Sequence, residues 1–150
     1  MTERVDFYVL KSTNPKDRRM VACRLTEKAY LQEHRVLILN EDMAEAQALD
    51  ELLWTFNERA FIPHELCVRR GSADLQAAVH LVLDLEAAPE TDVLVNMSSR
   101  LPGQLQRFAR IVEILDGDEQ RRRLGRERFK SYRDLRLNLE THQLDDGGLA

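Results

Sequence analysis

Two short apolar segments separated by a stretch of helix length constrain this chain more than any other feature. Residues 5–10 (VDFYVL) and 35–39 (RVLIL) each have the length and composition of a buried strand. Between them, Asn14-Pro15 ends the first segment and can begin a helix, and the pattern over 16–34 is helical. A polar, acidic segment then precedes a second helical stretch over 43–56. This β-α-β-α order predicts an α/β domain.

The rest of the chain continues the alternation less regularly. We expect a short helix within 101–109 and a charged helix over 119–135. Residues 1–142 are predicted to form one domain with a mostly parallel, Rossmann-like sheet flanked by helices, and 143–150 a disordered tail. The expected strands are 65–68, 79–83 (or the end of a short helix there), 92–96 and 110–115, with turns at 69–74 and 88–90.

Composition limits the classes of partner. With 150 residues, 43% of them hydrophobic, the chain can bury a core of its own. The formal net charge of −4 makes it a poor general binder of nucleic-acid backbones, although a local basic patch remains compatible with that total. No apolar run approaches the roughly 20 residues that span a bilayer, and no signal peptide is evident. We therefore expect a cytoplasmic protein without a membrane partner.

The sequence gives no positive argument for catalysis, a cofactor or a metal. Its six glycines form neither a GxGxxG motif nor a P-loop, and there is no GxSxG motif. No two histidines have the spacing of metal ligands on one helix. Cys23 and Cys67 suit a reducing compartment and are predicted to be small buried side chains. Asp6, an unusual residue in a strand, is interpreted as a solvent-facing acid, with a functional site as the alternative.

One tryptophan falls outside the predicted core of its helix. At 100° per residue, Trp54 lies nearly opposite the apolar stripe of the second helix. Phe61-Ile62-Pro63 follows in a predicted loop and adds apolar surface. Either this loop and Trp54 cover each other, or together they form an exposed binding surface. The predicted apolar stripe consists of Ala48, Leu49, Leu52 and Phe56.

The last helix has two contrasting faces. Its predicted core side carries Leu124, Arg128, Ser131, Tyr132 and Leu135, whereas Arg122, Arg126, Lys130 and Arg133 lie opposite, with Phe129 at the border. Such a basic face can be simply solvated. Together with one aromatic residue it also suits an acidic peptide that ends in a hydrophobic residue. Single-stranded nucleic acid is a further alternative, but stacking proteins use several aromatic side chains.

These two regions carry a resemblance to a known family. Residues 49–54 (LDELLW) with 61–64 (FIPH), and residues 125–133 (GRERFKSYR), resemble segments of the chi subunit of bacterial DNA polymerase III. Residues 7–10 and 35–38 are similar to the family's opening strands in order and spacing. The resemblance extends from residue 4 to about 139, whereas 68–90 match poorly and receive no function.

The resemblance implies a non-catalytic subunit that links two partners. One is the psi subunit, which joins chi to the clamp-loader complex, and its interface would include Trp54, Phe61 and Pro63. The other is the acidic C-terminal tail of single-stranded DNA-binding protein. By motif match, Arg126, Phe129 and Lys130 would carry the tail site, with Tyr132 and Arg133 supporting it. Phe129 stands where the family has tyrosine. Little direct nucleic-acid binding is implied. A nucleotide-dependent enzyme and a direct binder of single-stranded DNA remain the alternatives.

Overall fold

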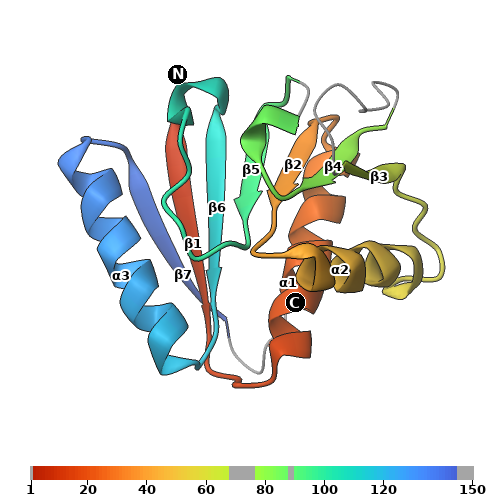
Figure 1. Ribbon diagram of the computed structural model, residues 1–150, viewed down its shortest axis with the longest axis horizontal. Coiled ribbons are helices and arrows are strands. Elements are labelled where there is room, and N and C mark those ends of the chain that lie inside the picture. The colour runs from red at the N-terminus through yellow and green to blue at the C-terminus, as the bar shows by residue number, and fades with distance from the viewer. Residues whose placement is uncertain (1, 68–76, 88–89, 145–150) are drawn as a thin grey trace.

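A computed structural model describes residues 2–67, 77–87 and 90–144. Within these ranges the chain alternates strands and helices, as the sequence predicted (Figure 1). The elements in chain order are β1 (Arg4–Leu10), α1 (Pro15–Leu31), β2 (Val36–Leu39), α2 (Met43–Thr55), β3 (His64–Cys67), β4 (Val79–Val82), η1 (Leu85–Ala87), β5 (Val93–Asn96), η2 (Leu105–Arg107), β6 (Arg110–Leu115), α3 (Glu119–Asp134) and β7 (Leu139–Leu144).

The described strands form one seven-stranded sheet in the order β3-β4-β2-β5-β6-β1-β7. Every neighbouring pair is parallel. The predicted α/β class and its parallel, Rossmann-like sheet are therefore confirmed. The four residues of β2, β4 and β5 are all buried, as expected for central strands covered on both faces.

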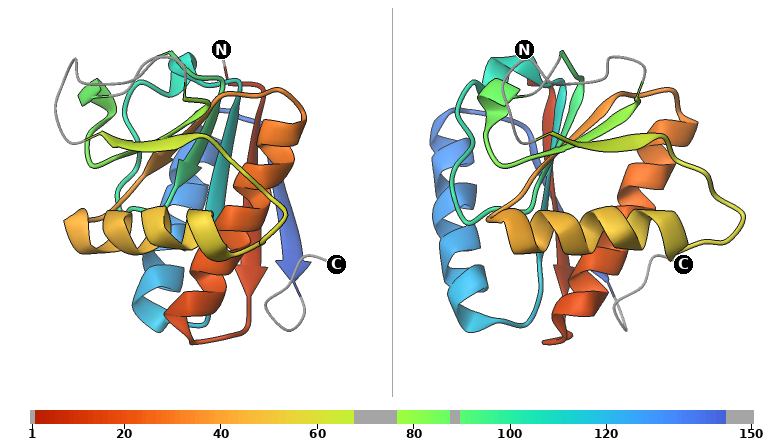
Figure 2. Two further views of the ribbon diagram at one scale, coloured as in Figure 1. Left: turned by 90° about the vertical axis from the view of Figure 1, so that its right-hand side faces the viewer. Right: turned by 45° about the vertical axis from the view of Figure 1, so that its right-hand side comes forward.

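The helices lie in two layers on opposite faces of the sheet. Figure 2 shows α1 and α2 on one face and α3 on the other. From β1 to β2 the chain crosses past β6 and β5, whereas from β6 to β7 it crosses past β1 in the opposite direction. Parallel crossovers are almost always right-handed, so reversing the direction moves the helix to the other face. Two hydrophobic clusters fill the spaces between these layers and the sheet.

Local signals in the sequence set where the helices begin. The Asn14 side chain accepts a hydrogen bond from the Lys16 amide, with Pro15 in the first turn of α1. Asp42 caps α2 in the same way through the Glu45 amide. Asp118 caps α3 through the Arg121 amide. The predicted starts of the first two helices are confirmed by these contacts.

The last strand was missed by the sequence analysis. β7 pairs with β1, and its final residues, Gln143 and Leu144, had been assigned to the tail. The assignment was wrong there because β7 gains its partner from the far end of the chain. The predicted helix over 101–109 is also smaller than expected, since only the three-residue turn η2 forms. The predicted turns at 69–74 and 88–90 fall wholly or mainly outside the described residues.

Strand β7 also overturns the interpretation of Asp6. The Asp6 side chain is fully buried, and its Oδ2 accepts hydrogen bonds from Arg4 Nε (2.9 Å) and Arg110 Nε (2.7 Å). Nε2 of His142, on β7, lies 2.9 Å from Asp6 Oδ1. Burial alone raises the pKa of Asp6, but the hydrogen bonds from His142 and Arg110 outweigh it and leave the pKa below its ordinary value. Asp6 therefore joins β1, β6 and β7 and does not face solvent.

Candidate protein-binding surfaces

Trp54 and Phe61 lie together and remain exposed. Their ring centroids are 5.7 Å apart, yet the two residues keep 50% and 69% of their surface accessible. Ile62, the neighbour of Phe61 in the chain, is buried, so successive side chains of this segment point to solvent and to the interior. The aromatic side chains touch each other without covering each other, so they are exposed as one of the two interpretations expected, and their role in binding stays a prediction. We call Trp54, Phe61 and Pro63 the aromatic surface.

His64 holds the aromatic surface in position. Its imidazole is fully buried, and Trp54 packs against it with a centroid distance of 4.2 Å. Its Nδ1 lies 2.7 Å from the carbonyl oxygen of Ile62, and its Nε2 lies 3.1 Å from that of Asp50. His64 thereby joins the end of α2 to the start of β3. The sequence pattern gave His64 no such role, because its contacts with Trp54 and with the Asp50 carbonyl form only when β3 packs beside the end of α2.

The aromatic surface continues into a groove beside α2. This groove has a volume of about 530 Å³ and is lined by Ala48, Leu52 and Trp54 together with Lys16 and Arg19. Leu49 of the predicted stripe is fully buried and Leu52 is partly buried against the core, but the other fully buried positions of α2 are Ala46 and Leu53. The buried stripe is therefore rotated relative to the prediction, which leaves more apolar surface next to Trp54.

On α3, the motif that carried the family resemblance divides into an outer and an inner set. Arg126, Lys130 and Arg133 are exposed and recur at i, i+4 and i+7 on one face of the helix. We call these three residues the basic strip. Within the described part of the chain, no ion pair is formed by Arg126 or Lys130, and Arg133 has only Asp134 at 3.9 Å. The basic strip is therefore available to anionic groups of a partner.

Arg128 and Tyr132 point inward to a buried carboxylate. Glu113, fully buried on β6, accepts hydrogen bonds from Arg128 Nη2 (3.0 Å), the Tyr132 hydroxyl (2.7 Å) and Asn96 Nδ2 (2.9 Å). Arg128 Nη1 also donates to the carbonyl oxygen of Ser99. Burial, and then the charge of Glu113, raise the pKa of Tyr132 well above its ordinary value. This network fixes the rotation of α3 and so determines which side chains face outward.

The structure confirms some of the positions expected for the last helix and changes others. Tyr132 is fully buried, so it can support a peptide site only through the position of the helix. Phe129 is half-buried, in keeping with its predicted place at the border of the two faces, and packs edge-to-face on Phe7 at a ring-centroid distance of 5.2 Å. Leu135, assigned to the core side, is 56% exposed. Arg122 is tied to the backbone by bonds to the carbonyl oxygens of Asp116 and Leu10, which removes it from the basic strip.

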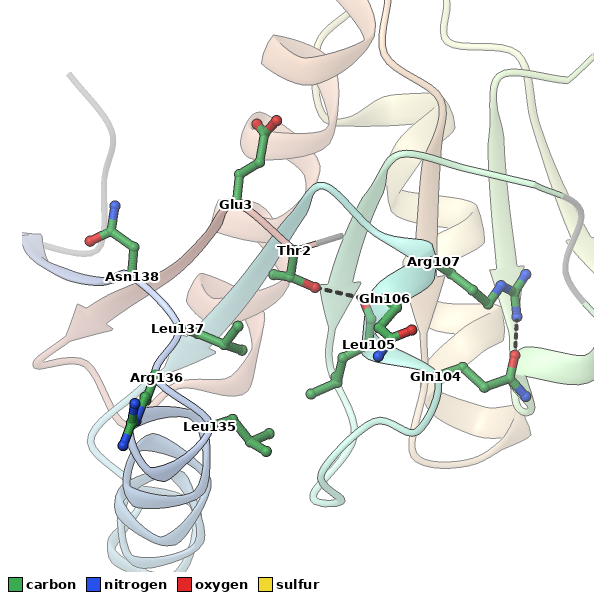
Figure 3. Close-up of a pocket in the computed structure, with 10 residues that line it drawn as sticks. All are labelled: Thr2, Glu3, Gln104, Leu105, Gln106, Arg107, Leu135, Arg136, Leu137 and Asn138. Carbon is green, nitrogen blue, oxygen red and sulfur yellow. Dashed lines mark hydrogen bonds between the residues drawn. The ribbon is translucent and has the colours of Figure 1, made fainter.

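A cavity lies at the C-terminal end of α3 (Figure 3). Its volume is about 950 Å³, and its walls combine Leu105, Leu135 and Leu137 with Arg107 and Arg136. Figure 3 shows the Thr2 hydroxyl donating to the carbonyl oxygen of Leu105 (2.6 Å), which joins the N-terminal segment to η2 at this wall. The sequence did not predict this cavity, because its walls come from three separate parts of the chain.

The carboxyl edge of the sheet is packed with the chain's own backbone between β1 and β6. In α/β proteins this edge receives nucleotides at the point where the direction of the crossovers reverses. Here the amide of Gly117 donates to the carbonyl oxygen of Ser12 (2.7 Å). A Cβ atom at position 117 would lie 2.6 Å from the Lys11 carbonyl oxygen, so only glycine permits this approach. Nearby, Arg18 is buried against the carbonyl oxygen of Ile114, and burial lowers its pKa to about 10.

Both cysteines are buried, as predicted, and they form no disulfide with each other. Burial raises the pKa of the Cys23 thiol to about 12, so Cys23 is a poor nucleophile at neutral pH.

No helix within the described residues is both long enough and apolar enough to cross a bilayer.

Comparison with known proteins identifies the family of the chain. The sequence profile described as DNA polymerase III chi subunit, HolC, matches residues 1–140. The chain is 38% identical over 141 residues to DNA polymerase III subunit chi of Pseudomonas aeruginosa, covering 94% of this chain and 96% of that protein. It is 28% identical over 141 residues to the Escherichia coli K12 protein of the same name, covering 90% and 94% of the two chains. For the Haemophilus influenzae protein of that name the identity is 26% over 144 residues, covering 96% and 99%.

These matches span almost the whole chain and include the segments with the aromatic surface and the basic strip. The chain therefore belongs to the DNA polymerase III chi subunit family.

Proposed function

We propose that this accessory subunit of the replicative DNA polymerase bridges two proteins and performs no catalysis of its own. Through the basic strip it would hold the acidic C-terminal tail of single-stranded DNA-binding protein. Through the aromatic surface it would hold the psi subunit and, indirectly, the clamp-loader complex. Linking two modest contacts raises the effective concentration of each partner, which keeps the polymerase near coated template. The proposed site of action is the cytoplasm.

The observation that carries the tail site is the basic strip itself. The protein has a net charge of −4, yet Arg126, Lys130 and Arg133 form a row of cations that the described residues leave largely uncompensated. Arginine donates to carboxylates in a fork geometry, and lysine adds a point charge, so the row suits an acidic peptide. The half-buried ring of Phe129 supplies adjacent apolar surface for the peptide's terminal side chain. Exposed charges are screened by salt, so binding should weaken as ionic strength rises.

The first experiment is a pull-down of single-stranded DNA-binding protein, with and without its last few residues. We expect retention of the full-length protein only. Retention of the truncated protein would reject the tail as the binding element. Tight binding of an oligonucleotide by the chain alone would instead favour a direct single-stranded DNA binder.

A calorimetric titration with a tail peptide then tests the residues. Arg126→Ala should weaken binding by about 1–3 kcal/mol, the range for a charge-assisted hydrogen bond, or about 5- to 150-fold in Kd. Arg24→Ala is the matched control, because Arg24 is an exposed arginine on α1, on the opposite face of the sheet. Equal losses of affinity in both variants would mean that binding depends on the overall charge of the protein and not on the basic strip. No loss in Arg126→Ala would reject the basic strip as the tail site.

A second pair of variants distinguishes the two apolar places that adjoin α3. If the terminal side chain of the peptide packs on Phe129, Phe129→Ala lowers the affinity and Leu135→Ser does not. The reverse result would move the terminal side chain into the cavity bordered by Leu135. The affinity for a peptide that lacks its terminal hydrophobic residue measures how much of the binding depends on this contact.

The psi interface is supported by the exposure of the aromatic surface. Trp54 and Phe61 are large apolar side chains, half or more exposed, in contact with each other and next to an apolar groove. Clustered aromatic residues of this kind are enriched at binding hot spots. Co-purification with psi should be lost in Phe61→Ala and kept in Leu31→Ala, whose leucine is 71% exposed on α1. Equal retention in both variants would reject this surface.

A further inference from the structure

The edge of the sheet that lies farthest from α3 brings together three metal-ligating side chains. Glu65 and Cys67 are two residues apart on β3, so their side chains lie on the same face of the strand. His80 on β4 is the register partner of Glu65. One ligand atom from each side chain, a carboxylate oxygen, the thiol sulfur and an imidazole nitrogen, lies within 4.8 Å of the other two. The three donors therefore converge from two neighbouring strands.

We propose that Glu65, Cys67 and His80 form a binding site for a zinc ion. Zinc takes a mixed set of thiolate, imidazole and carboxylate ligands, whereas magnesium and calcium prefer oxygen alone. With metal–ligand bonds of about 2.0–2.3 Å, two ligands of a tetrahedral ion lie about 3.3–3.8 Å apart. The observed spacing of up to 4.8 Å needs only small side-chain rotations to reach this range. Three protein ligands leave a fourth position for water or another ligand.

The burial of this cluster favours a tightly held ion. Cys67 is 1% exposed and His80 is fully buried, while Glu65 is partly buried. A buried thiolate is costly by itself, but a bound divalent cation stabilises it and releases its proton. Because low-dielectric surroundings strengthen the attraction between the ion and its anionic ligands, a small site of this kind can bind strongly.

A second cluster, of two carboxylates and one histidine, is not part of the proposal. Asp6, Glu140 and His142 also bring their ligand atoms within 4.8 Å of one another. There, however, Arg4 and Arg110 already donate hydrogen bonds to the Asp6 carboxylate, and two guanidinium groups would repel a cation. The Asp6 cluster is therefore an ion-pair network, and the proposal concerns only the cluster on β3 and β4.

The proposed ion would have a structural consequence for the aromatic surface. It would cross-link β3 to β4, and β4 is the neighbour to which β3 is hydrogen-bonded at the edge of the sheet. β3 begins at His64, immediately after Pro63 and beneath Trp54. Fixing β3 therefore fixes the segment that presents the aromatic surface.

Cobalt(II) provides the direct test, because a thiolate ligand gives the cobalt complex a charge-transfer band in the near ultraviolet. The full chain, freed of metal with a chelator and kept reduced, would be titrated with cobalt chloride and then with zinc chloride. We expect one equivalent of cobalt to produce the band and zinc to remove it by displacement. Zinc alone should raise the melting temperature.

Two cysteine variants decide which thiol is responsible. Cys67→Ser should lose the band, whereas Cys23→Ala should keep it, because Cys23 is a buried thiol in the other hydrophobic cluster. Glu65→Gln, at a partly buried position, should lower the cobalt affinity about tenfold or more while circular dichroism shows an unchanged fold. Absence of the band in the wild-type chain, or its persistence in Cys67→Ser, would overturn the proposal. If Cys67→Ser does not fold, unchanged cobalt affinity in Glu65→Gln overturns it instead.

Discussion

The substitution Tyr132→Phe, which removes one oxygen atom, tests whether the inward-facing residues of α3 stabilise the fold or contact the peptide. The Tyr132 hydroxyl donates to Glu113 at 2.7 Å, and both side chains are fully buried. In Tyr132→Phe the ring remains to pack edge-to-face against Phe7, at a centroid distance of 6.0 Å. The substitution therefore removes a hydrogen bond and leaves the packing in place.

The loss of stability in Tyr132→Phe depends on the hydrogen bonds that Glu113 retains. In the variant its carboxylate still accepts hydrogen bonds from Arg128 and Asn96, so it is not left without donors. The loss is then that of one hydrogen bond to a charged group, about 1.5–3 kcal/mol in the free energy of unfolding. For a domain of this size each kcal/mol lowers the melting temperature by about 2–4 °C, which gives a decrease of about 3–12 °C. Replacing Arg128 by methionine would cost more, about 3–5 kcal/mol, because the buried carboxylate of Glu113 would lose the arginine with which it forms an ion pair.

Urea denaturation followed by circular dichroism measures the stability, and calorimetry with the tail peptide measures the affinity of the same protein. We expect Tyr132→Phe to lose stability and keep its affinity when measured well below its melting temperature. Arg126→Ala should do the opposite, since Arg126 is exposed and its loss removes no contact within the described protein.

Two results would refute this reasoning. A loss of stability below about 0.5 kcal/mol, the usual size of a surface substitution, would mean that the buried network does not hold α3. A tenfold loss of affinity at unchanged stability would mean that Tyr132 reaches the peptide, and hence that α3 rotates on binding.

Three further substitutions test other parts of the structure. Trp54→Ala should lower stability by about 1–3 kcal/mol, from two ring contacts worth about 0.5–1.5 kcal/mol each, while abolishing psi binding; a much larger fall in melting temperature would place the ring in the core. Gly117→Ala should cost about 1–3 kcal/mol in urea denaturation, because its Cβ would meet the Lys11 carbonyl oxygen at 2.6 Å; an unchanged midpoint would show that the loops separate easily. The pKa of Asp6 is lower in the folded protein than its usual 3.8, so its ion pairs contribute fully above that value. That contribution is lost as the pH falls through the pKa of Asp6 in the folded protein. In Asp6→Asn, the free energy of unfolding, measured by urea denaturation, should therefore fall less steeply with decreasing pH. An equally steep fall would mean that other groups cause the acid sensitivity.

Much of the fold followed from local patterns in the chain. Buried parallel strands need short apolar runs, and helices need capping residues, so the β-α-β-α order was evident around residues 5–10, 35–39 and Asn14. Trp54 and Phe61 were also identified correctly as a pair, because a tryptophan opposite an apolar stripe requires either a cover or a partner. In each case the decisive information lay within a few residues of the feature.

Contacts between distant segments were beyond such patterns. β7 forms because β1 offers it a partner more than a hundred residues earlier in the sequence, and Asp6 is buried because that strand covers it. Likewise, Glu65, Cys67 and His80 have no metal-ligand spacing along the chain and meet only through the register of β3 and β4.

The last helix shows both kinds of information in one motif. Its sequence determined an amphipathic helix with a row of basic residues, since side chains at i, i+4 and i+7 share a face wherever the helix is placed. The helical phasing also predicted Arg128 and Tyr132 on the core side and Arg126, Lys130 and Arg133 opposite, and the structure confirms these positions. Only the tertiary structure decided which buried groups hold the helix in this rotation. The physical reason is Glu113, a buried charge on another strand that must be neutralised and hydrogen-bonded, and that therefore sets the rotation of α3.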